Sequence, residues 1–217
     1  MPAEDGGSVP GTSRSRSHAG RGLKVRLRSV CDQASARSAS RRGLHVMARG
    51  NRRRALFLRG LDFDRFLSML DELARRRRWI GNSYCLLPNH YHLVVETPAA
   101  DLSRGMQWLN GRYAQAFNRI HGFDGHLFQG RFTSLLVESD RHLLELGRYL
   151  ALNPVRAGLS GRPEDWTWSS YRAHVGLEAP RRFLAPDGML SLFGRSRERA
   201  RERFADFVHD VPARRPA

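Results

Sequence analysis

The run from Leu87 to Glu96 constrains the fold most, because its side chains alternate as they do in a β-strand. Successive side chains of a strand point to opposite faces. One face would carry His90, His92, Val94 and Glu96, and the other, which we expect to face a core, would carry Tyr91, Leu93 and Val95. The two imidazoles would then lie about 7 Å apart along the strand. This spacing could hold one metal ion, although a pair of surface histidines would look the same in the sequence.

The charge of the chain points to nucleic acid as a partner. The chain has 217 residues, of which 41% are hydrophobic, enough for one folded core with tails. Its formal net charge is +16 and its pI is about 11.4. Lys24 is the only lysine, so a bias toward arginine codons is a competing explanation. Such a bias explains arginine in place of lysine, but not the excess of basic over acidic residues.

The cysteines and the apolar runs limit the compartment. Cys31 and Cys85 form no C-x-x-C pair, which favours a reduced protein and excludes a zinc site built on cysteine. No apolar run approaches the roughly 20 residues that span a membrane. The first residues do not resemble a signal peptide. We therefore expect a cytoplasmic, nucleoid-associated protein with no membrane partner.

Three regions differ in composition. Residues 1–42 are rich in Ser, Gly, Arg and Ala and are expected to form a disordered basic tail. Residues 43–172 are expected to form the main domain, and residues 173–217 a helical extension with a last helix at 197–208.

The main domain has a regular order of predicted elements. Strands are predicted at 44–49, 79–87, 90–96 and 131–138, and helices at 62–78, 101–121 and 141–152, the last of these stopping at Asn153-Pro154. The order β-α-β-β-α-β-α predicts an α+β fold. We expect a ferredoxin-like (split βαβ) antiparallel sheet with helices packed on one face, followed by a C-terminal catalytic helix.

Tyr149 and Asn153 are four residues apart at the end of that helix, so they share a face. The Asn153 carboxamide could be a third, neutral metal ligand, and the Tyr149 hydroxyl could attack a phosphodiester. Phosphate chemistry with an amide oxygen ligand favours Mg²⁺ or Mn²⁺. A half-buried helix tyrosine and an asparagine that ends a helix are the structural alternatives. Tyr113 is a rival nucleophile, but it lies within an apolar stripe and is expected in the core.

These motifs resemble the single-tyrosine HUH transposases, and in particular the REP-associated tyrosine transposases of bacteria. The resemblance covers roughly residues 44–172, and its motifs are Arg49–Asn51, Leu87–Val95, Phe128–Phe132, Tyr149–Leu159 and Trp168–Tyr171. Related insertion-sequence enzymes usually have Gln where Asn153 stands, whereas the REP-associated branch tolerates Asn.

The resemblance implies a role for each site residue. His90, His92 and Asn153 would bind the divalent metal, and Tyr149 would be the nucleophile. The family cuts single-stranded DNA near a hairpin, leaving a 5′-phosphotyrosine and a free 3′-OH, and joins a second strand by the reverse reaction. The chain would then be a DNA transposase acting on single-stranded or hairpin (REP-like) DNA, as a monomer or a homodimer.

Single-stranded DNA requires a positive groove and stacking surfaces. The candidate arginines are Arg49, Arg52, Arg53, Arg54, Arg131, Arg148 and Arg156. Trp166, Trp168 and Tyr171 could stack on bases, but we favour a packing role for them.

Two other functions remain open. The chain could be a catalytically retired regulator that still binds hairpin DNA, although all four chemical residues are present. A metallohydrolase unrelated to DNA has less support, because the chain has no H-E-x-x-H motif. Rolling-circle nickases and relaxases use similar residues, but here the tyrosine follows the histidine strand, as in the transposases.

Overall fold

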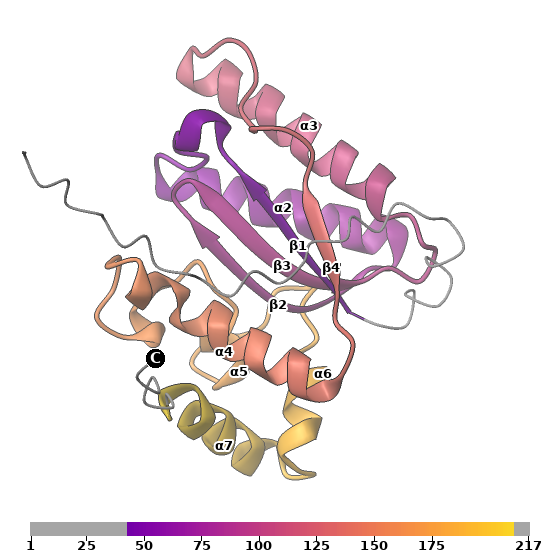
Figure 1. Ribbon diagram of the computed structural model, residues 1–217, viewed down its shortest axis with the longest axis vertical. Helices are drawn as coiled ribbons and strands as arrows, with labels where there is room; N and C mark the ends of the chain where they lie inside the picture. Colours follow the sequence, from indigo (N-terminus) through magenta and orange to yellow (C-terminus); the bar gives the residue numbers. More distant parts are fainter. Residues whose placement is uncertain (1–42, 211–217) are drawn as a thin grey trace, which may run out of the picture.

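A four-stranded antiparallel sheet forms the centre of the computed structural model, which describes residues 43–210 (Figure 1). In sequence order the strands are β1 (Leu44–Arg49), β2 (Ile80–Leu87), β3 (His90–Glu96) and β4 (Thr133–Leu136). Their order across the sheet is β2-β3-β1-β4, with β1 between β3 and β4. The predicted ferredoxin-like α+β fold is confirmed. The expected tail at 1–42 lies outside the described residues.

Helices cover both faces of the sheet. The two long helices α2 (Gly60–Arg77) and α3 (Leu102–His121) lie together on one face (Figure 1). On the opposite face lies α4 (Asp140–Arg156), and beyond it are α5 (Tyr171–His174), α6 (Pro186–Leu190) and α7 (Arg197–His209). Residues 43–210 also form three short 3₁₀ helices: η1 (Asn51–Arg53), η2 (Pro163–Asp165) and η3 (Ser191–Phe193). None of the helices within residues 43–210 has the length and apolar character needed to cross a membrane.

The alternation of β3 produces two cores. Tyr91 and Leu93 are fully buried under α2 and α3, in the main core. Tyr113 lies there too, with its hydroxyl donating to the backbone oxygen of Leu56 at 2.6 Å, so its assignment to the core is confirmed. On the other face, Val94 packs with Leu146 of α4. The histidine face of β3 is therefore also the face on which α4 docks.

Helix α4 continues past the point where the sequence predicted its end. Pro154 lies inside the helix, which ends only at Arg156. A proline lacks the N–H that would bond one turn back, and this is why a stop is expected. Here the following amides close the last turn, with Ala157 N donating to Asn153 O and Leu159 N to Pro154 O, both at 2.9 Å. Asn153 therefore has helical geometry and stays one turn below Tyr149.

The aromatic segment after α4 lies along the outer edge of β2. Trp166 Nε1 donates to Leu86 O at 3.0 Å, and Leu86 N donates to Trp168 O at 2.9 Å. The Trp168 ring stacks on Phe63 of α2 at 4.7 Å between centroids. These contacts give the two tryptophans a packing role, as the sequence favoured.

Candidate active site

His90 stands at the start of β3, where the turn from β2 orients its ring. Its Nδ1 lies 2.7 Å from the side-chain oxygen of Asn89. Because a carbonyl oxygen only accepts, Nδ1 must carry the proton and donate. The other nitrogen, Nε2, then keeps its lone pair, which is the state that a metal ligand requires.

His92 lies two residues further along the same face and is buried. Its Nδ1 is 3.0 Å from Nε2 of His45, which comes from the neighbouring strand β1. The register pairs Met47 with His92, so His45 is the diagonal neighbour on the same face. The two rings stack at 5.2 Å between centroids. His92 Nε2, in contrast, is buried and has no hydrogen-bond partner.

Helix α4 brings Tyr149 to this face. Leu146 and Leu150 are buried against the sheet, and their packing turns the intervening Tyr149 toward the histidines. The Tyr149 ring lies 5.6 Å from the His92 ring, at an interplanar angle of 88°. Its side chain is 39% exposed, so a large substrate can reach the hydroxyl. In this structure the helix docks on the sheet of its own chain.

Asn153 lies one turn below Tyr149, and its side chain is buried with Nδ2 unpartnered. A rotation of the carboxamide exchanges its oxygen and nitrogen, so the buried end can present an oxygen. Within residues 43–210, no three His, Cys, Asp or Glu side chains are grouped to hold a metal. Any ligand set made from His90 and His92 would thus need a third donor of another kind, such as a carboxamide oxygen.

The electrostatics favour neutral imidazoles. Burial lowers the pKa of His92 to about 2, with smaller contributions from His45 and His90. Burial likewise lowers the pKa of His45 to about 4 and depresses that of His90. Near pH 7 these rings carry no extra proton, so a cation would not have to displace one.

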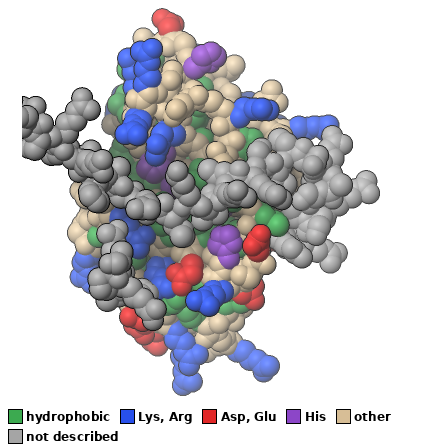
Figure 2. Space-filling view, in the orientation of Figure 1, with side chains coloured by type: hydrophobic (Ala, Val, Ile, Leu, Met, Phe, Trp, Pro, Cys, Tyr) green, Lys and Arg blue, Asp and Glu red, His purple; other side chains and the backbone are tan. Residues whose placement is uncertain are grey.

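Most of the predicted DNA-binding arginines surround this face. Arg49, Arg52, Arg53 and Arg54 are exposed at the end of β1, Arg131 is exposed after the glycine-rich link, and Arg156 is exposed beyond Asn153. Gly50 N donates to Asn89 O at 2.9 Å, which holds the loop after β1 beside the β2–β3 turn. Gln129 N donates to Arg49 O, also at 2.9 Å, and this bond brings the glycine-rich link to the same place. In Figure 2 basic side chains are spread over the visible face of the molecule, and several of them lie on its upper part.

Arg156 and Arg148 differ sharply in their surroundings. The guanidinium carbon of Arg156 is 5.8 Å from the centre of the Tyr149 ring. Arg148 is buried, and its Nη1 donates to the backbone oxygens of Phe207 at 3.3 Å and Asp210 at 2.7 Å. From the sequence, Arg148 was expected at the DNA because it is next to Tyr149. Adjacent residues of a helix point in directions about 100° apart, and the Arg148 side chain points to α7.

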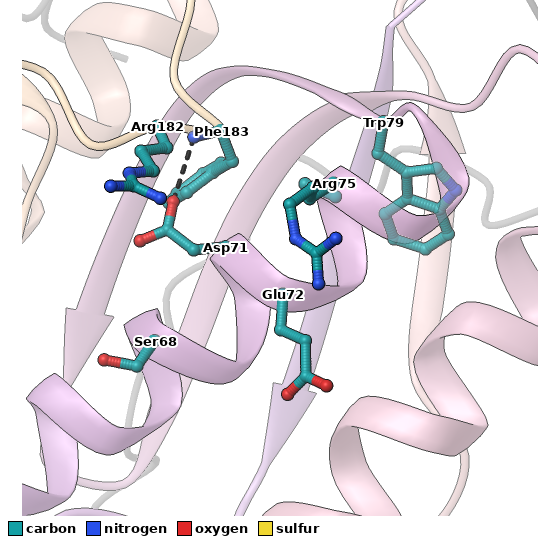
Figure 3. Close-up of a pocket in the computed structure, with 8 residues that line it drawn as sticks. Ser68, Asp71, Glu72, Arg75, Trp79, Arg182 and Phe183 are labelled. Atoms are coloured by element: carbon teal, nitrogen blue, oxygen red, sulfur yellow. Dashed lines mark hydrogen bonds between the residues drawn. The ribbon is translucent and has the colours of Figure 1, made fainter.

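Two hollows lie away from the histidine face of the sheet. They measure about 390 and 510 Å³ and lie between α2 and the segment around residues 180–183, and both are lined by Asp71 and Arg182. Figure 3 shows the first, in which Asp71 accepts a hydrogen bond from Phe183 N at 2.9 Å. That bond ties the C-terminal segment to α2.

No functional role for His45 was predicted from the sequence. It appears there only as a polar residue within a predicted strand. Its contact with His92 depends on which strands are neighbours and on their register, and neither can be read from one sequence. The available signal was a histidine within an otherwise largely apolar predicted strand.

The chain is similar to known transposases. Residues 38–153 match the family described as "Transposase IS200 like". A protein of Haemophilus influenzae named as a REP-associated tyrosine transposase is 27% identical over 105 residues, covering 43% of this chain and 60% of that protein. The chain thus spans less than two thirds of that relative's length.

A solved structure has a similar fold. It is described as a REP-associated tyrosine transposase bound to a REP hairpin, and it superposes with a TM-score of 0.55 at 19% identity. The match covers 66% of this chain and 85% of that one.

Proposed function

The chain belongs to the IS200-like transposase family, and on that premise we propose that it cleaves and rejoins single-stranded DNA at REP-like hairpins through a covalent bond to Tyr149. The observation that carries the proposal is the approach of Tyr149 to His92 within one chain, at 5.6 Å between rings. Two buried polar atoms without a hydrogen-bond partner, His92 Nε2 and Asn153 Nδ2, also support it.

A divalent cation fits this donor set. His90 and His92 would supply imidazole nitrogens and Asn153 a carboxamide oxygen, with Mg²⁺ or Mn²⁺ as the ions suited to phosphate chemistry. When bound, such an ion polarises the scissile phosphate and stabilises the charge that develops on it. The unpartnered state of His92 Nε2 supports this assignment, because a buried polar atom normally has a partner.

Tyr149 would act as the nucleophile. Its hydroxyl oxygen attacks the phosphorus atom, a new P–O bond forms to the tyrosine, and the bond from phosphorus to the 3′ oxygen breaks. The phenolic proton is lost, and the departing 3′ oxygen gains one to become a free hydroxyl. Attack of a 3′-OH on the phosphotyrosine reverses the exchange and joins the strands. The phosphotyrosine ester retains the free energy of the cleaved phosphodiester bond, so the joining step needs no external energy source.

The exposed arginines would hold the backbone of the DNA. Arg156 is near Tyr149, and the group at 49–54 lies beside His90, so phosphates on both sides of the cleavage point have a cationic partner. The hairpin preference is inferred from the relatives, one of which is described as bound to a REP hairpin. A chromosomal DNA substrate would place the protein at the nucleoid, in the cytoplasm.

The test is formation of a covalent protein–DNA adduct. Purified protein, Mn²⁺ and a single-stranded oligonucleotide containing a hairpin from the gene's own genomic surroundings should give an adduct stable in denaturing gels. Tyr149→Phe should abolish the adduct and retain hairpin binding. Tyr113→Phe is the matched control, since that hydroxyl is buried in the main core and its loss should leave the adduct intact.

The same assay separates the two main functions. Tight hairpin binding without any adduct, across the hairpins of that neighbourhood, would identify a DNA-binding regulator and overturn the proposed chemistry. An adduct that persists in Tyr149→Phe would overturn the assignment of the nucleophile.

A further inference from the structure

His45 lies outside the proposed set of metal ligands but contacts one of them, His92. We propose that His45 is a positioning residue that keeps the proton of His92 on Nδ1. The Nε2 lone pair of His92 then faces the site where a cation would bind. This inference rests on the proposed function for its purpose, but the hydrogen-bond arrangement can be tested without it.

The contact between the two rings is close and enclosed. His45 Nε2 and His92 Nδ1 are 3.0 Å apart, at hydrogen-bond distance, and the rings stack at an interplanar angle of 24°. His45 is 6% exposed and His92 4%. Adjacent strands of the sheet, β1 and β3, carry the two residues, so the geometry is set by rigid elements rather than by a loop.

A bond between two neutral imidazoles contains a single proton, so one ring donates and the other accepts. If His92 donates from Nδ1, its Nε2 is a bare lone pair. If His45 donates from Nε2, His92 must carry its own proton on Nε2 and cannot bind a cation there. The identity of the donor therefore decides whether His92 can be a ligand.

The surroundings favour His92 as the donor. Its Nε2 is buried and unpartnered, so a proton there would be an N–H group without an acceptor, which is rare in folded proteins. His45 would then carry its own proton on Nδ1, its other ring nitrogen.

The residue at position 45 must then be a hydrogen-bond acceptor of the right reach. Histidine meets this requirement through Nε2, and Gln would meet it through its side-chain oxygen. Phe would keep an aromatic ring beside His92 but would offer no acceptor. His45→Gln and His45→Phe therefore form a matched pair that separates hydrogen bonding from packing.

The test is the tautomer of His92, read from long-range ¹H–¹⁵N spectra of histidine-labelled, metal-free protein. We expect Nδ1 of His92 to be protonated in the wild type and in His45→Gln, and the proton to shift toward Nε2 in His45→Phe. Mn²⁺ affinity, measured by titration calorimetry, should fall about 10- to 100-fold in His45→Phe and recover in His45→Gln.

The outcomes of this test and of the adduct assay are independent. A wild-type spectrum with the His92 proton on Nε2 would overturn the positioning role, and it needs no variant to fold. Unchanged Mn²⁺ affinity in a folded His45→Phe would overturn it too. Absence of any DNA adduct, with the expected tautomers observed, would instead overturn the proposed function and leave the role of His45 standing.

Discussion

Replacing Arg148 by Met tests whether this arginine stabilises the fold or binds DNA. The side chain is buried, and its guanidinium donates to two backbone oxygens at the end of α7, at 2.7 and 3.3 Å. It also lies 3.9 Å from the centre of the Phe207 ring and pairs with Glu145. Those carbonyls are near the C-terminal end of α7, where a cation also complements the helix dipole.

The cost can be worked from these contacts. Met keeps most of the aliphatic packing but removes the charged donors and leaves two carbonyls short of a partner. Charge-assisted bonds and unsatisfied buried groups each cost about 1–3 kcal/mol. Glu145 is half exposed, so its ion pair adds little. We expect the free energy of unfolding to fall by about 2–3 kcal/mol in total, taking the bonds as partly compensated by water.

Thermal unfolding and hydrogen exchange measure this effect. The melting temperature should fall by roughly 4–12 °C for a chain of this size, and amides of α7 should exchange faster than those of α2. Hairpin affinity and its salt dependence should be unchanged at a temperature where both proteins are folded. Arg156→Met is the control: it should keep the melting temperature but lower the salt slope by about 0.7, the loss of one phosphate contact.

The opposite pattern would refute this account of Arg148. If Arg148→Met leaves the stability unchanged and weakens DNA binding with a reduced salt slope, the arginine reaches the DNA, and the contacts with α7 are not its main role.

Three further predictions address the site and the core. The pKa of His45 is lowered to about 4 and that of His92 to about 2, so the unfolded chain binds more protons than the folded one below about pH 6.5. As the pH falls from 6.5 toward 4, the metal-free protein should therefore lose stability by up to about 1.4 kcal/mol per pH unit for each histidine. A melting temperature that does not change over this range would contradict this prediction. Mn²⁺ at 100 times its dissociation constant should stabilise the protein by about 2.7 kcal/mol, an effect that EDTA reverses and that His92→Ala should remove, as followed by thermal melts. Gly105→Ala should lower the free energy of unfolding by about 1–3 kcal/mol in denaturant titrations, because the new methyl group would meet the buried Trp79 ring. Gly111→Ala in the same helix is the control: its methyl group meets nothing within 4 Å, and the change should be neutral or stabilising. Equal effects of the two substitutions would show that the Trp79 ring moves freely.

Much of the fold could be predicted because local signals agree with the final structure. The strand Leu44–Arg49 has the predicted bounds, and α3 runs over the predicted residues, since alternation and helical periodicity are properties of short segments. Pro154 shows the limit of such signals. A proline predicts a helix end, but the hydrogen bonds that follow it depend on the path of the chain beyond.

The candidate site likewise has parts that local sequence signals predict and parts that depend on long-range contacts. The face shared by His90 and His92 follows from strand geometry, and the face shared by Tyr149 and Asn153 follows from helix geometry. That the helix docks on its own sheet depends on contacts of Leu146 and its neighbours with the sheet, which are long-range. The partner of His92 in the next strand likewise depends on strand order and register.

The outer edge of β2 is closed by its own chain, and this has a consequence for assembly. Gly81 N and O bond to Phe183 O and Ala185 N, both at 2.8 Å, and further along the edge Tyr84 O accepts from Ser170 N at 2.9 Å. An edge strand with free amides invites a strand from another molecule, whether in a fibre or in a continuous intermolecular sheet. Those groups are already occupied here. A second copy cannot lengthen the sheet at β2 without first peeling away two segments of the C-terminal region.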